Sequence, residues 1–360
     1  MSKIVSIGTA VPAFCHDQMN ILQFMQQVYA AGEADRRKMR FIYQQSGIKQ
    51  RYSVLADYGK PLQEWKFYPA TENLEPFPSI EQRMSVYNKQ APLLSVDAIR
   101  DCLNHTHDHK KITHLITVSC TGMSAPGLDL QVMELMDLEK DIFRTSVNFM
   151  GCYAAIHALK IADALCKADA SARVLVVCTE ICTLHFQREN TLDNIASSLL
   201  FGDGSAAVLV TGDGYEHEGL TIDSFYSEIL PKGKRDMAWE LSSTGFLMTL
   251  SGYVPDLIEA DFGGIVDKAL RKQDMSREQV SHWCIHPGGK SILNAIHKTL
   301  SLDEASLQSS FDVLGEFGNL SSATILFVLK RMMQQKKDIS KLFGAAFGPG
   351  LTVETFTAHW

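Results

Sequence analysis

The sequence lacks four features that would assign it to a specialised class of protein. It has no apolar run long enough to cross a bilayer and no excess of positive charge, since its 34 lysines and arginines are outnumbered by 41 aspartates and glutamates. Its eight cysteines are scattered, several inside apolar runs such as VLVVC, rather than paired as in a disulfide framework or a zinc site. The N-terminal segment has neither the hydrophobic region nor the cleavage site of a signal peptide. These absences argue against a membrane or nucleic-acid partner and predict reduced thiols in a cytoplasmic protein.

What the sequence does contain is a regular alternation of strand-like and helix-like segments. Strands are expected at 113–119, 143–149, 172–178, 205–210 and 220–230, and helices at 128–136 and after residue 152. The strand that precedes residue 152 is expected to be buried. Segment 231–240 is expected to be a loop. This rhythm is typical of α/β proteins. A polar, glycine-flanked turn at 214–219 is the best internal boundary, so two halves are expected, 1–218 and 219–360.

The second half of the sequence repeats the pattern of the first. The strand-like segment 282–286 resembles 116–120, and segment 316–333 reproduces the aromatic residue, glycine and apolar helix of 148–165. Cys120 precedes Cys152 by 32 residues, and His286 precedes Asn319 by 33. A duplicated βαβα unit places Cys152 and Asn319 at equivalent helix N-termini and His286 at the end of an equivalent strand. Because ligands of open α/β sheets bind outside the carboxyl ends of strands, we expect these three residues to converge.

Each of the three residues has a structural and a functional interpretation. Cys152 is either a small buried hydrophobe or a nucleophile whose thiolate is favoured by a helix N-terminus and a nearby imidazolium. His286, in the turn IHPGGKS, is either a hydrogen-bonding cap or a catalyst held rigidly at a strand end. Asn319 is either an N-cap or an amide that donates to a developing oxyanion. The matching spacings favour the functional interpretation of all three.

These residues resemble the type III polyketide synthases, the chalcone and stilbene synthase group of the thiolase-fold superfamily. The similarity extends over nearly the whole chain. It rests on MGCYAA around Cys152, HPGG with His286, GNLSSATILFVL with Asn319, LFGDGSAAV at 200–208 and FGPGLTVET at 347–355. The resemblance implies duplicated βαβαβαββ halves that form a layered αβαβα sandwich. It also implies a homodimer that needs no metal and no organic redox cofactor.

Carried over by position, the resemblance implies a role for five residues. Cys152 carries the acyl group, and His286 pairs with it to hold the thiolate. His286 and Asn319 together stabilise the enolate that malonyl-CoA leaves when it loses carbon dioxide. Phe201 matches a gatekeeper between the CoA tunnel and the acyl cavity, and Ser321 matches a serine that lines this cavity.

The chain departs from the plant enzymes at positions that bear on the substrate. Met248 stands where the second gatekeeper phenylalanine is expected, and Trp239 stands where plant chalcone synthases have a glycine. If the Trp239 ring points inward, it reduces the space for starter or product. Of the three basic residues that hold the CoA phosphates, only Lys38 is matched, because Phe41 and Gln45 occupy the other two positions. An acyl-carrier-protein donor therefore stays open beside CoA, and the basic cluster around Lys38 also fits a solvated helix face.

The expected function is iterative decarboxylative condensation of an acyl-CoA starter with malonyl-CoA, followed by release of a cyclised pyrone, resorcinol, phloroglucinol or chalcone-type product. One alternative is a condensing enzyme of the β-ketoacyl synthase III type that performs a single round. Another is a Cys-His-Asn thioester hydrolase, which can also use these residues in this order. A third is a catalytically silent binding protein, against which the presence of Cys152 argues. The starter, the number of extensions and the mode of ring closure depend on cavity shape.

Overall fold

A nine-stranded sheet runs through the computed structural model, which describes residues 1–30, 32–71, 73–104, 109–215, 217–335 and 339–360. The strands of the first half are β1 (Ser2–Ala10), β4 (His114–Ser119), β5 (Phe143–Asn148), β6 (Arg173–Ile181) and β7 (Asp203–Gly212). Those of the second half are β8 (Leu220–Ile229), β11 (His282–Ile285), β12 (Leu342–Gly348) and β13 (Thr352–His359). The strands and helices expected from the alternation are thus confirmed. Residue 216, inside the turn expected at 214–219, lies outside the described residues.

The sheet has the internal duplication that the sequence repeat predicts. The strand order is β1-β7-β6-β4-β5 in the first half and β8-β13-β12-β11 in the second. Strands β7 and β13 are both antiparallel to their two neighbours, while β4 is parallel to β6 as β11 is to β12. The two halves join through three residue pairs between β1 and β8. In the described part of the chain β5 has no counterpart, and an isolated bridge between Phe201 and Asn319 lies near the second helix start instead.

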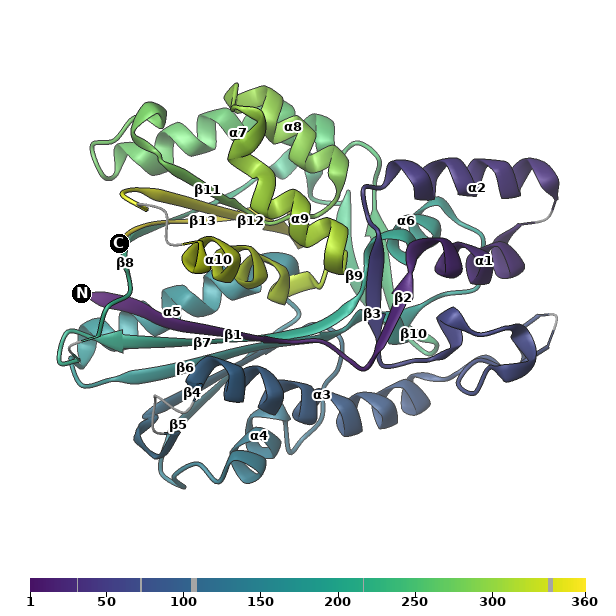
Figure 1. Cartoon of the computed structure of the whole chain (residues 1–360), viewed down its shortest axis with the longest axis horizontal. Coiled ribbons are helices and arrows are strands. Elements are labelled where there is room, and N and C mark those ends of the chain that lie inside the picture. Colours follow the sequence, from purple (N-terminus) through teal and green to yellow (C-terminus); the bar gives the residue numbers. More distant parts are fainter. Residues whose placement is uncertain (31, 72, 105–108, 216, 336–338) are drawn as a thin grey trace.

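Helices cover both faces of each half-sheet, and Figure 1 shows the resulting five layers. One outer layer holds α3 (Ile80–Leu103) and α4 (Leu128–Met136), and the other holds α7 (Val254–Arg271) and α8 (Lys290–Leu300). The middle layer is formed by α5 (Ala154–Ala168) and α10 (Thr324–Gln334), whose core includes residues of both half-sheets. All nine residues of β6 are buried, because a strand covered on both faces can be apolar throughout. The αβαβα order expected from the resemblance is confirmed.

Smaller elements extend the sandwich at the end where the site lies. They are the helices α1 (Gln18–Tyr29), α2 (Glu33–Gln45), α6 (Leu192–Leu200) and α9 (Gln308–Phe317), and the strand pairs β2 (Phe14–Asp17) with β3 (Gln50–Ser53) and β9 (Met237–Ser242) with β10 (Gly245–Leu250).

Two local predictions are wrong. Segment 231–240 is not all loop, because its end pairs with β10 as a hairpin. The strand before Cys152 is not buried, because β5 is an edge strand with mostly exposed residues.

No helix within the described ranges is both long and apolar enough to cross a bilayer. Within the same ranges, no group of three or more histidine, cysteine or acidic side chains is arranged to hold a metal ion.

Candidate active site

The two halves of the molecule bring Cys152, His286 and Asn319 to one cavity. Cys152 lies in a 3-10 turn (Gly151–Tyr153) that leads into α5, and His286 directly follows β11. Asn319 lies between α9 and a second 3-10 turn (Ser321–Ala323) that leads into α10. All three line a cavity of about 650 Å³. The convergence expected from the spacing is therefore present in the structure.

Each of the two helix starts is preceded by a glycine with a left-handed backbone. Gly151 has a φ of +75° and Gly318 a φ of +71°, a region that side chains with a Cβ rarely adopt. A Cβ on Gly151 would lie 2.1 Å from Cδ of Pro349, in the FGPG segment of the second half. The glycine thus permits both the turn that directs Cys152 into the cavity and the close approach of Pro349.

The Cys152 thiol is enclosed by residues of the second half. It donates long hydrogen bonds to Oδ1 of Asn319 at 3.9 Å and to Oγ of Ser321 at 3.8 Å. Burial raises the pKa of Cys152 to about 12, although the contacts with Ser321 and Asn319 lower it. This direction is opposite to the one expected from the helix N-terminus alone, because loss of hydration outweighs the dipole. The sulfur is therefore held as a thiol and needs a proton acceptor to become a nucleophile.

His286, in the wall of the same cavity, is the candidate for that acceptor. The residue is 1% exposed, and neither ring nitrogen has a hydrogen-bond partner in the described structure. Its backbone is fixed, since its N–H donates to Ala345 O and its carbonyl accepts from the N–H of Gly288. Burial lowers the pKa of His286 to about 3, so the ring is neutral. A buried neutral imidazole with both nitrogens free can take one proton and donate another.

The orientation of the Asn319 amide is set by its own hydrogen bonds. Oδ1 accepts from the backbone N–H of Ser321 at 2.8 Å and from the hydroxyl of Thr324 at 3.3 Å. Nδ2 donates to Gly288 O at 3.4 Å, which leaves its second hydrogen for the cavity. Both interpretations of Asn319 therefore have a structural counterpart, because the oxygen caps the turn while the nitrogen is left as a donor.

Phe201 is tied to Asn319 through the main chain. The N–H of Asn319 donates to Leu200 O, and the N–H of Gly202 donates to Asn319 O. Arg51, which sequence reasoning missed, donates from Nη1 to Phe201 O at 2.5 Å and from Nε to Gln18 Oε1 at 2.9 Å. The arginine thereby holds the short segment between α6 and β7 that carries the expected gatekeeper.

Met248 and Trp239 are directly opposite each other on the β9–β10 hairpin, and both line the cavity. The indole Nε1–H of Trp239 donates to the carbonyl of Cys120 at 2.7 Å. This bond holds the ring in the cavity wall. The Trp239 ring therefore points inward, which is the case in which it reduces the space for starter or product. Ser321 also lines the cavity, with a φ of +50° that is strained for a serine.

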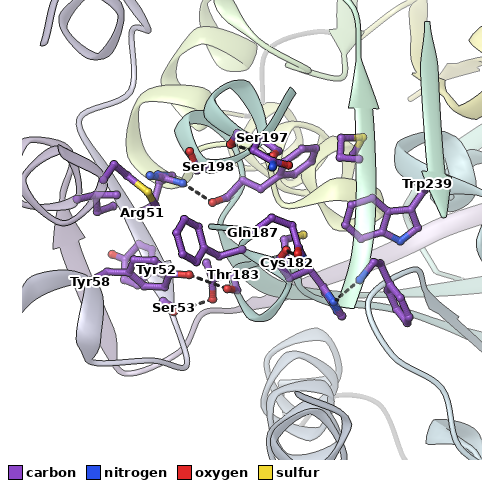
Figure 2. Close-up of a pocket in the computed structure, with 18 residues that line it drawn as sticks. Arg51, Tyr52, Ser53, Tyr58, Cys182, Thr183, Gln187, Ser197, Ser198 and Trp239 are labelled. Carbon is purple, nitrogen blue, oxygen red and sulfur yellow. Dashed lines mark hydrogen bonds between the residues drawn. The ribbon is translucent and has the colours of Figure 1, made fainter. Parts of the chain in front are cut away.

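A second cavity of about 580 Å³ adjoins the first (Figure 2). The two share the side chains of Cys182, Phe201, Trp239 and Met248. Cys182 is buried, and it also separates the two cavities. The second cavity could not be foreseen, since its walls come from α1, β3, α6 and the β9–β10 hairpin, which are far apart in the sequence.

The buried carboxyl of Glu180 links the halves behind the site. It accepts from Cys120 N and from the Thr121 hydroxyl, both at 2.9 Å, and from the hydroxyl of Ser322 at 2.5 Å. Burial raises its pKa. These bonds hold the loop after β4 against the turn that carries Asn319.

Lys38 is not brought to the cavity walls. It lies on an exposed face of α2, in the same helix as the exposed Phe41.

Comparison with known proteins identifies the family. The family model for the N-terminal domain of chalcone and stilbene synthases matches residues 1–214, and the model for the C-terminal domain matches residues 221–359. The chain belongs to the chalcone and stilbene synthase family. Its fold, cavity and paired helix starts are thus those of a member of this family.

Relatives of this family member include proteins from a slime mould and a brown alga. The chain is 31% identical to "Probable polyketide synthase 1" of Dictyostelium discoideum over 98% of its own length, and it spans 11% of the length of that relative. It is also similar to the C-terminal type III polyketide synthase domain of Steely1, a type I/III hybrid from Dictyostelium, with a TM-score of 0.92, 30% identity and 99% of each chain covered. Polyketide synthase PKS-I of the brown alga Ectocarpus siliculosus gives a TM-score of 0.93 at 25% identity, covering 99% of this chain and 98% of that one.

Proposed function

We propose that the protein is a type III polyketide synthase that loads an acyl starter on Cys152 and extends it by repeated decarboxylative condensation with malonyl-CoA. The observation that carries this proposal is the meeting, in one cavity, of a thiol, an imidazole with two free nitrogens and an oriented amide. The products would be cyclised pyrones, resorcinols, phloroglucinols or chalcone-type compounds.

Loading moves one proton from the sulfur of Cys152, by way of His286, to the sulfur of CoA. The Cys152 thiol gives its proton to His286, and the resulting thiolate attacks the carbonyl of the starter thioester. The imidazolium formed at the same moment stabilises the thiolate and returns the proton to the sulfur of CoA as the thioester bond breaks. A thiolate suits this step because it both attacks a thioester and leaves it at similar energy.

Extension begins when malonyl-CoA loses carbon dioxide, which leaves an enolate with negative charge on the thioester oxygen. The neutral His286 ring and Nδ2 of Asn319 donate to this oxygen, and each such donor is typically worth about 2.7–4 kcal/mol. The enolate carbon then forms a bond to the acyl carbonyl on Cys152, and the sulfur is released as thiolate. The extended chain on CoA can be loaded again. No carboxylate base is needed, because decarboxylation itself generates the carbanion.

Four residues in the walls of the cavity are proposed to bind substrate, namely Phe201, Met248, Trp239 and Ser321.

Lys38 is proposed to contact CoA phosphate from α2, and a carrier-protein donor stays an alternative to CoA at this surface. Charge reversal in Lys38→Glu should raise the KM for malonyl-CoA with little change in kcat.

Residues 1–218 and 219–360 are proposed to be the two structural halves, and a homodimer is proposed to form along β5. This strand is the exposed edge of the sheet, and Phe143 on it is 72% exposed. Met123 and Leu135 are exposed large apolar side chains of the segments around it. An open strand edge with exposed apolar side chains on and around it favours pairing with a second copy. Light scattering of the wild type and of Phe143→Glu tests this, with a monomeric wild type as the contrary result.

The eight free cysteines support a reducing, cytoplasmic location.

The experiment that tests the function is incubation with malonyl-CoA and short, fatty and aromatic acyl-CoA starters, followed by mass analysis of products. Triketide or longer pyrones support the proposal. Products that stop at a β-keto acyl chain would indicate the single-round alternative, and starter hydrolysis faster than condensation would indicate the hydrolase.

A further inference from the structure

The cavity beside the site has no assigned occupant, although only four side chains separate it from the cavity of Cys152. Apolar and aromatic side chains from several elements form much of its wall, among them Ile21 and Met25 of α1, Tyr58, Phe186 and Phe246. In Figure 2, Trp239 lies on one side of this cavity, and Arg51 and Tyr58 lie on the other. A group attached to Cys152 that passes the separating side chains would enter this space.

The polar side chains in the wall of the second cavity already have partners within the protein. The Ser197 and Ser198 hydroxyls donate to carbonyls of their own helix, α6, and the Ser53 and Thr183 hydroxyls lie 2.7 Å apart. The amide of Gln187 donates to the carbonyls of His185 and Thr244.

His185 behaves as part of the apolar wall. Nε2 of its ring is 2.7 Å from Thr121 O, Nδ1 accepts from the Phe246 N–H at 3.1 Å, and the ring stacks on that of Phe246. Burial lowers its pKa to about 3, so the ring carries no charge. The imidazole is therefore a flat aromatic surface with both nitrogens occupied.

Among the described residues of this wall, Arg51 is the one charged group. Two of its guanidinium nitrogens are bonded to Phe201 O and Gln18, so they serve the protein framework. The third, Nη2, is buried and has no hydrogen-bond partner among the described residues. Apart from this nitrogen, the hydrogen bonds of the wall are made within the protein, which favours a ligand that brings little polar surface, since burying a polar group without a partner is costly.

We propose that the second cavity takes the hydrocarbon end of an unbranched aliphatic acyl starter, which extends the proposed polyketide synthase function by naming its substrate class. Two of the four separating side chains, Phe201 and Trp239, are large and aromatic. The other two, Cys182 and Met248, are small or flexible, so a thin polymethylene chain passes more easily than a rigid ring. The chain then fills an apolar space while its thioester carbonyl stays at Cys152.

The first arm of the test compares starters in the wild-type enzyme. The thioesters are acetyl-, hexanoyl-, decanoyl- and cinnamoyl-CoA, with the CoA monothioester of a dicarboxylic acid as the charged counterpart of decanoyl-CoA. We expect kcat/KM to rise from acetyl to the longer aliphatic starters by about tenfold or more, since each buried methylene adds discrimination. Preference for cinnamoyl-CoA would overturn the aliphatic assignment. Preference for the carboxylated chain would make Arg51 a ligand contact and overturn the hydrocarbon assignment.

The second arm fills the cavity from two sides. Ser198→Phe places a ring in it from α6, and Ile21→Phe does so from α1, whereas Gln23→Phe adds the same ring on the exposed face of α1 as a matched control. The filled variants should lose the longer starters and keep acetyl-CoA, and the control should keep the wild-type profile. An unchanged chain-length profile in both filled variants would overturn the proposal.

Malonyl-CoA decarboxylation, measured in every variant, separates this inference from the proposed function. Decarboxylation with an unchanged starter profile refutes only the second cavity. Absence of decarboxylation and condensation in the wild type refutes the proposed function itself.

Discussion

Replacement of Asn319 separates its two structural roles. In Asn319→Ala, the cavity loses the Nδ2 donor, which should slow malonyl-CoA decarboxylation by about 10²–10³-fold, or about 2.7–4 kcal/mol of transition-state stabilisation. The same change removes Oδ1, which accepts from the buried N–H of Ser321 at 2.8 Å. Leaving that N–H without a partner should cost about 1–3 kcal/mol of folding stability.

Asn319→Asp is the matched control, because it keeps the acceptor for Ser321 and replaces the donor with a carboxylate oxygen. It should be more stable than Asn319→Ala in urea unfolding. It should decarboxylate no faster than the alanine variant, because a carboxylate repels the enolate oxygen. The assay is release of carbon dioxide from malonyl-CoA, read beside the unfolding midpoint of each variant.

The reasoning would be refuted if activity followed stability. An aspartate variant that recovered most of the lost decarboxylation would show that Asn319 acts as a cap and that its nitrogen does not contact the enolate.

The remaining predictions concern three other positions. His286→Ala should suppress both acyl loading and malonyl-CoA decarboxylation, and unchanged carbon dioxide release would remove His286 from its proposed role. Gly151→Ala should destabilise the protein by about 2–4 kcal/mol, because a Cβ there contacts Pro349 too closely and the backbone has a left-handed φ. The control is Gly264→Ala, on α7 with open space around it, which should be neutral or slightly stabilising in urea unfolding. The pKa of His185 is lowered from 6.5 to about 3, so its contribution to stability is present above the unfolded pKa and is lost as the pH falls toward the folded one. Between about pH 7.5 and about pH 5 this loss is about 2 kcal/mol. The unfolding free energy of His185→Gln should therefore fall by about 2 kcal/mol less than that of the wild type over this range. The same pH slope in the two proteins would contradict this prediction.

Much of the fold follows from the sequence because the duplication is visible in it. The nearly equal spacings of Cys120 to Cys152 and His286 to Asn319 correspond to equivalent positions in two half-sheets with the same strand directions. Glycines with positive φ stand before both helix starts, where the repeat places them. The exposure of β5 was not predicted, because a strand sequence by itself does not reveal whether a neighbouring strand follows it in the sheet.

The ionisation of the site and its second cavity were less accessible to sequence reasoning. A helix N-terminus indicates a lowered thiol pKa, but the enclosure of Cys152 by Ser321 and Asn319 depends on how the halves pack. Arg51 and His185 carry no motif that marks them, and their contacts with Phe201 and Phe246 join segments about 150 and 60 residues apart. Side-chain direction at such contacts is a property of the assembled fold.

The most direct test of the central claim is the mass of the intact protein after brief exposure to an acyl-CoA starter, measured for the wild type and for Cys152→Ala. The wild type should gain one acyl group, located on Cys152 by peptide mapping. Cys152→Ala should gain none and form no condensation product, while it keeps part of the malonyl-CoA decarboxylation that His286 and Asn319 support. An acyl group on another residue, or condensation by Cys152→Ala at the wild-type rate, would contradict the assignment of Cys152 as the acyl carrier.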